Sequence, residues 1–152
     1  MNKDIVICDI DGTISQVGER LRYLQETPPD WDSFYEDCFD DEPIVEMCLL
    51  VRSLRKAGYN IIFCTGRRDS VRDRTEAWIK RYVSEDFTIP RILMRPTADH
   101  RHDTEVKPEL LQRHLTEAER QRIAFILEDR DSMVEKWREL GYRCLQVAKG
   151  DF

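Results

Sequence analysis

The chain has 152 residues, of which 41% are hydrophobic and 36% charged, and its formal net charge is −6. This size and composition are typical of a soluble globular protein, and we expect residues 1–152 to form one domain. The negative balance argues against a large nonspecific nucleic-acid surface, although a local basic site remains compatible with it. We see no apolar stretch of membrane-spanning length, no signal peptide and no C-x-x-C pair, and therefore expect no membrane partner and a cytoplasmic location.

The first predicted element is a buried strand at about residues 4–10, an apolar run that leads into Asp9, Asp11, Gly12 and Thr13. Ligands of open α/β sheets bind at the carboxyl ends of the strands. Because side chains alternate along a strand, Asp9 and Asp11 would share a face. Two carboxylates there can bind a divalent cation, or one can attack a substrate while the other handles a proton. The alternative interpretation is a solvated turn, since Asp-Gly is a common turn pair.

A polar stretch that contains several aromatic residues comes next. It is too long for an ordinary connection between strand and helix, so we predict a small insertion at about residues 15–42, near the mouth of the site. A helix is predicted over 43–58, starting at Pro43. A second buried strand over 60–64 then ends in Thr65, Gly66 and Arg67.

The remaining elements continue the alternation of helices and strands. A helix follows residue 70, a short strand covers 91–94, and Pro108 is expected to open the next helix after a charged stretch. A strand over 123–127 ends in Glu128 and Asp129, and a last helix and strand follow. Strands separated by helices predict a parallel sheet with right-handed crossovers. We therefore predict a Rossmann-like three-layer α/β sandwich with a central parallel sheet and no large cap domain.

Three polar clusters follow predicted strands, at residues 9–11, 65–67 and 128–129. In a parallel sheet all three lie at the same edge, which favours a functional site over surface decoration. Asp9 and Asp129 would hold Mg²⁺, while the Thr65 hydroxyl and the Lys107 ammonium suit the oxygens of a phosphate. Taken singly, Lys107 is more typical of a surface lysine at a helix start and Thr65 of a strand-end cap, so the inference depends on the whole set.

The order of these motifs is D-I-D-G-T, T-G-R after a strand, a lysine, and an acidic pair after a strand. This order resembles the haloacid dehalogenase-like phosphohydrolase superfamily. The resemblance implies catalysis through an aspartyl-phosphate, with Asp9 as the nucleophile and Asp11 as the general acid and base. It also implies that Thr65 and Lys107 bind the phosphate of the substrate.

The same resemblance implies a Mg²⁺ site made by Asp9, Asp129 and the backbone carbonyl of Asp11. Glu128 stands where the superfamily commonly has an aspartate. Which member of the pair Glu128 and Asp129 contacts the metal directly is left open by the sequence, and we include both among the candidate ligands.

A closer resemblance covers nearly the whole chain. The stretches C-T-G-R, T-E-A-W-I, L-M-R and C-L-Q-V-A-K-G-D-F are similar to the phosphatase domain of bacteriophage polynucleotide kinase-phosphatases. This resemblance implies removal of 3′-phosphates from DNA or RNA ends and from nucleoside 3′-monophosphates. It adds Arg20, Arg67 and Asp103 to the substrate-binding set of Thr65, Gly66 and Lys107, with Asp103 orienting Lys107. No G-x-x-x-x-G-K-[ST] motif occurs, so we expect a phosphatase module without a kinase half.

Two other classes of function stay open. The same mechanism could act on a small metabolite or a 5′-nucleotide, although the lack of a large cap favours a site that admits a polymer end. A non-catalytic adaptor is disfavoured by the intact motif set. Zinc binding by His100, His102 and a cysteine lacks a clear set of four ligands. Oligomeric state, preference for DNA or RNA, and a separate kinase or ligase partner are not indicated by any motif.

Overall fold

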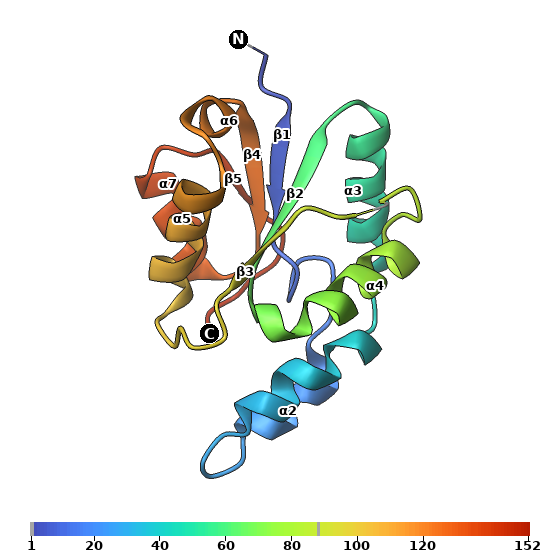
Figure 1. Ribbon diagram of the computed structural model, residues 1–152, viewed down its shortest axis with the longest axis vertical. Coiled ribbons are helices and arrows are strands. Elements are labelled where there is room, and N and C mark those ends of the chain that lie inside the picture. The colour runs from blue at the N-terminus through green and yellow to red at the C-terminus, as the bar shows by residue number, and fades with distance from the viewer. Residues whose placement is uncertain (1, 88) are drawn as a thin grey trace.

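The computed structural model describes residues 2–87 and 89–152, which form a parallel sheet between two layers of helices (Figure 1). Its five strands are β1 (Ile5–Cys8), β2 (Asn60–Arg68), β3 (Ile92–Arg95), β4 (Ile123–Glu128) and β5 (Cys144–Gln146). They lie in the spatial order β3-β2-β1-β4-β5, and every neighbouring pair is parallel. The predicted Rossmann-like α/β sandwich is confirmed.

Helices α3 (Val45–Lys56) and α4 (Arg72–Tyr82) cover one face of the sheet, and α5 (Asp103–His114) and α7 (Asp131–Glu139) cover the other. A short helix, α6 (Glu117–Gln121), precedes β4, and a 3₁₀ turn, Asp69–Val71, precedes α4. Two hydrophobic clusters fill the spaces between these layers, one around Trp78 and one around Trp137. Because both faces of the sheet are covered, the strands appear in the sequence as unbroken apolar runs. Within the described residues, no helix has the length and apolar character needed to cross a membrane.

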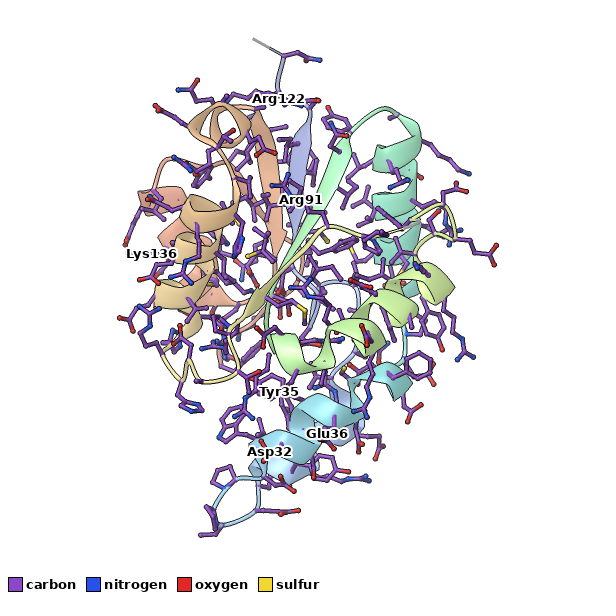
Figure 2. All side chains as sticks on the ribbon, viewed as in Figure 1. Asp32, Tyr35, Glu36, Arg91, Arg122 and Lys136 are labelled. Atoms are coloured by element: carbon purple, nitrogen blue, oxygen red, sulfur yellow. The ribbon has the colours of Figure 1, made fainter. Side chains whose placement is uncertain are left out.

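The predicted insertion is a helical flap, residues 15–42, beyond the carboxyl ends of the strands (Figure 1). It contains α1 (Leu21–Leu24) and α2 (Trp31–Glu36), with 3₁₀ turns at Gly18–Arg20 and Asp37–Asp40. Asp30 caps α2 by accepting a hydrogen bond from the Ser33 N–H at 3.0 Å. Figure 2 places Asp32 and Tyr35 on this flap and Arg122 at the opposite end of the sheet.

The helix that carries Lys107 begins at Asp103, so the predicted start at Pro108 is wrong. The His102 imidazole caps this earlier start by accepting from the Thr104 N–H at 3.3 Å. Pro108 lies inside α5, where its missing N–H removes one helical hydrogen bond. The earlier start places Asp103 and Lys107 one turn apart on the same side of α5.

Candidate active site

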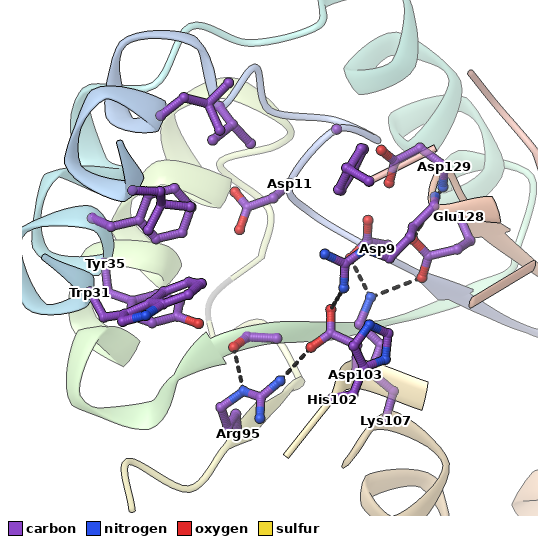
Figure 3. A pocket seen from close by; sticks show the side chains of 18 of the residues that line it. Asp9, Asp11, Trp31, Tyr35, Arg95, His102, Asp103, Lys107, Glu128 and Asp129 are labelled. Atoms are coloured by element: carbon purple, nitrogen blue, oxygen red, sulfur yellow. Dashed lines mark hydrogen bonds and ion pairs between the residues drawn. The ribbon is translucent and has the colours of Figure 1, made fainter. Parts of the chain in front are cut away.

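A cavity of about 910 Å³ lies at the carboxyl ends of the strands, with the flap on one side (Figure 3). Several predicted site residues line it: Asp9, Asp11, Gly66, Asp103, Lys107, Glu128 and Asp129. The other predicted site residues, Arg20, Thr65 and Arg67, are buried outside its lining. The three strand-end clusters therefore meet at one edge of the sheet, as the sequence predicted.

Three buried carboxylates form an acidic cluster at this edge. Asp9, Glu128 and Asp129 each offer one carboxylate oxygen, and these oxygens lie within 4.8 Å of one another. Lys107 bridges two of them, since its Nζ donates to Asp9 Oδ1 at 2.8 Å and to Glu128 Oε2 at 2.9 Å. The cluster thus holds more negative charge than the one ammonium group inside it can balance.

This excess of negative charge changes the acidity of two of the carboxyl groups. Burial, aided by the charge of Glu128 and opposed by Lys107, raises the pKa of Asp9 to about 7. Burial and the charge of Asp9 likewise raise the pKa of Asp129 to about 7. Oxygen donors with unbalanced negative charge fit a hard divalent cation such as Mg²⁺.

Glu128 and Asp129 differ in how many of their oxygens are already engaged. Glu128 accepts from Lys107 through Oε2, and its Oε1 accepts from the Asp129 N–H at 3.1 Å. Asp129 Oδ1 accepts from the Thr13 hydroxyl at 3.3 Å, whereas its Oδ2 accepts no hydrogen bond from the described residues. Asp129 is therefore the better placed of the two to bind a cation, and Glu128 positions Lys107.

Two glycines allow close contacts that any side chain would prevent. Gly12 has φ +83°, and a Cβ there would lie 2.1 Å from Asp129 Oδ2. A Cβ at Gly66 would lie 2.6 Å from Asp103 Oδ1. D-x-D-G-T and T-G-R therefore need glycine at these positions, because a carboxylate of another segment lies where a Cβ would be.

Asp11 lies outside the acidic cluster and is held by two arginines. Arg20 Nη2 donates to Asp11 Oδ1 at 2.8 Å, and Arg67 donates to both carboxylate oxygens through Nη2 and Nε. Burial alone would raise the pKa of Asp11, but the charges of Arg67 and Arg20 outweigh it and lower the pKa to about 2. In this arrangement Asp11 is ionised.

Asp41 is the second carboxylate of this network, and the sequence did not indicate its role. It accepts from Arg20 Nε at 2.7 Å, Arg20 Nη2 at 2.6 Å and Arg67 Nη2 at 3.2 Å. Two buried guanidinium groups need more than one carboxylate to balance them. The available signal was the acidic residue two positions before Pro43, at the start of a predicted helix.

We predicted that Arg20, Arg67, Thr65 and Lys107 contact the substrate phosphate together. Arg67 is fully buried, and the Thr65 hydroxyl accepts from the Arg67 N–H at 3.1 Å. Arg20 is 3% exposed and also donates to the Phe34 carbonyl. In the structure these arginines hold carboxylates, and their contact with a phosphate stays a prediction.

Asp103 has different partners from those predicted. It forms ion pairs with Arg95 and with Arg130, the latter at 3.0 Å, whereas Lys107 is held by Asp9 and Glu128. Burial opposes ionisation of Asp103, but the charges of Lys107, Arg130 and Arg95 lower its pKa. Asp103 therefore acts on Lys107 through its charge, while its direct ion pairs are with the two arginines, and the prediction that Asp103 orients Lys107 stays a prediction.

The flap side of the cavity is apolar, in contrast to its floor at the carboxyl ends of the strands. Its lining from the flap consists of glycine, aliphatic and aromatic residues, namely Val17, Gly18, Leu21, Leu24, Trp31, Phe34 and Tyr35. The segment that leads into α5 adds basic and acidic side chains to the lining, among them Arg95, Arg101 and Asp103. The cavity is thus polar where the strands end and hydrophobic beneath the flap.

The comparisons with known proteins agree with this arrangement. The family model of the phosphatase domain of the polynucleotide kinase PNKP matches residues 3–152. The chain is similar to a protein in the structure of the Pnkp1/Rnl/Hen1 RNA repair complex, with 30% identity and a TM-score of 0.81. That match covers 97% of this chain and 43% of the other, so our chain spans less than half the length of this relative.

More distant structures share the fold. The class C acid phosphatase from Bacillus anthracis has a TM-score of 0.61 at 17% identity, over 88% of this chain and 54% of the other. CbbY from Rhodobacter sphaeroides, in complex with phosphate, has a TM-score of 0.62 at 13% identity, over 98% and 87%. Since the family model spans nearly all of the chain, the protein is a haloacid dehalogenase-like phosphatase that belongs to the family of the polynucleotide kinase PNKP phosphatase domain.

Proposed function

We propose that this protein is a Mg²⁺-dependent phosphomonoesterase that removes 3′-phosphates from polynucleotide ends or nucleoside 3′-monophosphates. The observation that supports this most is the contact of Asp9 with Lys107 inside an acidic cluster, at the floor of a cavity larger than a phosphate. Family membership supports the chemistry, and the relative in an RNA repair complex supports nucleic-acid ends as the substrate class. Residues 1–152 would act as a single phosphatase domain.

Asp9 is the proposed nucleophile. One of its carboxylate oxygens attacks phosphorus, and the bond from phosphorus to the 3′-oxygen of the nucleotide breaks, which leaves a phosphoryl group on Asp9. Lys107 Nζ and the Thr13 hydroxyl both donate to Asp9, at 2.8 and 2.9 Å, and hold its carboxylate in one orientation. Lys107 and Thr65 are also the proposed partners of the phosphate oxygens, whose charge they would balance.

Asp11 is the proposed proton carrier. Asp11 first takes up a proton from solvent when the substrate binds, gives it to the leaving 3′-oxygen, and later takes one from the water that attacks the phosphorylated Asp9. Arg20 and Arg67 hold Asp11 ionised in the free protein, and a phosphate dianion in the cavity competes for their positive charge. Loss of that charge raises the pKa of Asp11, so that substrate binding itself prepares Asp11 to carry the proton.

Asp9 and Asp129, with the backbone carbonyl of Asp11, would hold Mg²⁺. When bound, the metal balances the repulsion between an anionic phosphate and an anionic nucleophile. Glu128 contributes by holding Lys107, which keeps the ammonium against Asp9.

The test is a comparison of phosphate release from a 3′-phosphorylated oligonucleotide, a nucleoside 3′-monophosphate and a nucleoside 5′-monophosphate. We expect the first two to be hydrolysed in Mg²⁺ and the third to be hydrolysed much more slowly. Excess chelator should stop the reaction, and Asp9→Asn is the inactive control. Equal rates on 3′- and 5′-phosphates would favour a general nucleotidase, and full activity in chelator would exclude the Mg²⁺ role.

A further inference from the structure

The flap carries two stacked aromatic rings that phosphate chemistry does not require. Trp31 and Tyr35 lie one turn apart on α2, with ring centroids 6.1 Å apart and ring planes inclined by 26°. Both side chains line the cavity that holds the acidic cluster, and Figure 3 shows them on the side opposite Asp129. We call this pair the aromatic platform.

A residue of β2, Arg68, contacts the aromatic platform and holds it in place. The Arg68 guanidinium lies over the Tyr35 ring, 4.9 Å from its centroid, and Arg68 Nη1 donates to Asp32 at 2.5 Å. Phe34 packs edge-on against both rings, and its own ring lies beneath the Arg20 guanidinium at 4.5 Å. The same arginine that binds Asp11 therefore fixes the position of the platform relative to the catalytic carboxylates.

Trp31 is not a core residue, unlike the other two tryptophans. It is 44% exposed, whereas Trp78 and Trp137 are 0% and 1% exposed. An indole ring that is fixed by its neighbours but open to a cavity is a surface on which a planar aromatic ligand can stack. Phosphate alone would leave most of the roughly 910 Å³ of this cavity unfilled.

We propose that Trp31, supported by Tyr35, stacks on the nucleobase of the nucleotide whose phosphate is removed. This inference rests on the proposed function, since it assigns the apolar side of the same cavity. The nucleobase is the occupant that fits, because it is the planar, uncharged part of the substrate and the flap side of the cavity is apolar. The phosphate and sugar would then lie toward Lys107 and Asp103. Every base has an aromatic face, so the contact tolerates any base.

The decisive experiment compares a nucleoside 3′-monophosphate with the matching abasic sugar 3′-phosphate. In Trp31→Ala we expect the KM for the nucleotide to rise about 5- to 100-fold with kcat nearly unchanged, because stacking contributes to binding before the reaction. The abasic substrate should be unaffected, and Trp31→Phe should retain most of the affinity. Leu49→Ala is the matched control, since Leu49 is 49% exposed on α3 and does not line the cavity.

A binding measurement without turnover supplies the second readout. Because Trp78 and Trp137 are buried, a free nucleoside should quench the fluorescence of Trp31, and the quenching should be lost in Trp31→Phe. Equal losses on the nucleotide and the abasic substrate in Trp31→Ala would overturn the proposal, as would an unchanged KM for the nucleotide. If the wild-type protein prefers 5′-nucleotides, the proposed function fails, while the same comparison on a 5′-nucleotide still tests the stacking.

Discussion

The buried Arg67 and the partly buried Asp11 form a bidentate ion pair, with Arg67 Nη2 2.7 Å from Asp11 Oδ1 and Arg67 Nε 3.1 Å from Asp11 Oδ2. The pair joins the end of β2 to the loop that follows β1. It also links the T-G-R motif to the D-x-D-G-T motif. Asp11, the proposed proton carrier, is thereby held by Arg67, which we predict to bind phosphate. The effects of breaking this ion pair on stability and on activity can be measured separately.

Arg67→Ala should lower both stability and activity. Removal of the guanidinium leaves the buried carboxylate of Asp41 and the partly buried carboxylate of Asp11 short of positive charge, which should cost about 3–5 kcal/mol in urea unfolding. Activity on a 3′-mononucleotide and on an oligonucleotide should fall alike if, as we predict, the lost group acts at the reacting phosphate. Arg122→Ala, which removes an ion pair with Asp4 at the far end of the sheet, is the control and should change both little. A selective loss on oligonucleotides would instead place Arg67 along the polymer.

Asp9→Asn should abolish turnover while the fold is kept. The amide is nearly isosteric with the carboxylate but does not form the phosphorylated intermediate, so activity should fall by orders of magnitude. Wild-type protein should be trapped by beryllium fluoride as an adduct on Asp9, which inhibition kinetics on the folded protein can detect. More than about a tenth of the wild-type activity in Asp9→Asn would argue against the covalent mechanism.

The metal-free protein should become less stable as the pH rises from about 4 to about 7. The pKa of Asp9 is raised from 3.8 to about 7 by burial and by Glu128, so the folded state binds this proton more tightly than the unfolded state does. The stability that this proton provides is present below the unfolded pKa and is lost as the pH passes through the folded pKa. Thermal unfolding in chelator should show the decline in wild-type protein, and Asp129→Asn should weaken it. Saturating Mg²⁺ should restore stability at pH 7, and its failure to do so would argue against a metal at the acidic cluster.

Asp129→Ala and Glu128→Ala should lower activity for different reasons. Asp129 has an oxygen without a hydrogen bond from the described residues, so its loss should raise the Mg²⁺ concentration needed for half-maximal activity or abolish activity. Glu128→Ala should do smaller damage to the metal requirement and should act mainly through Lys107, which loses one of its two carboxylate partners. A Mg²⁺ titration of phosphate release separates the two effects. A larger metal defect in Glu128→Ala would reverse the assignment.

Gly66→Ala should damage the site through Asp103. The added Cβ would lie 2.6 Å from Asp103 Oδ1, so this carboxylate and its arginine partners must move. We expect a loss of about 1–3 kcal/mol in stability, together with lower activity. In an Asp103→Ala background the stability cost of Gly66→Ala should shrink, because the colliding oxygens are gone. Equal costs in the two backgrounds would show that the clash is not the cause.

The sequence alone determined the parallel sheet and the edge at which the site lies. The strands inside the sheet are covered on both faces, so their residues form continuous apolar runs, and the runs of β1, β2 and β4 end where a polar cluster begins. The acidic residues 9, 11, 128 and 129 could be placed together for this reason, since parallel strands all end at one edge. A small insertion after the first strand was also predicted, because a stretch of that length is too long for an ordinary connection, although its helices were not.

The tertiary structure decided which charged groups hold one another. Arg67 contacts Asp11 across 56 residues of sequence, and Thr13 reaches Asp129 across 116. Neither partner could be identified from local patterns, because 30 acidic and 24 basic residues allow many pairings. Only the folded structure shows three features of the site, namely the role of Asp41, the arginine partners of Asp103 and the exposed face of Trp31. Local sequence specifies where a strand or helix ends, whereas the pairing of buried charges depends on long-range distance and burial, which the folded chain alone defines.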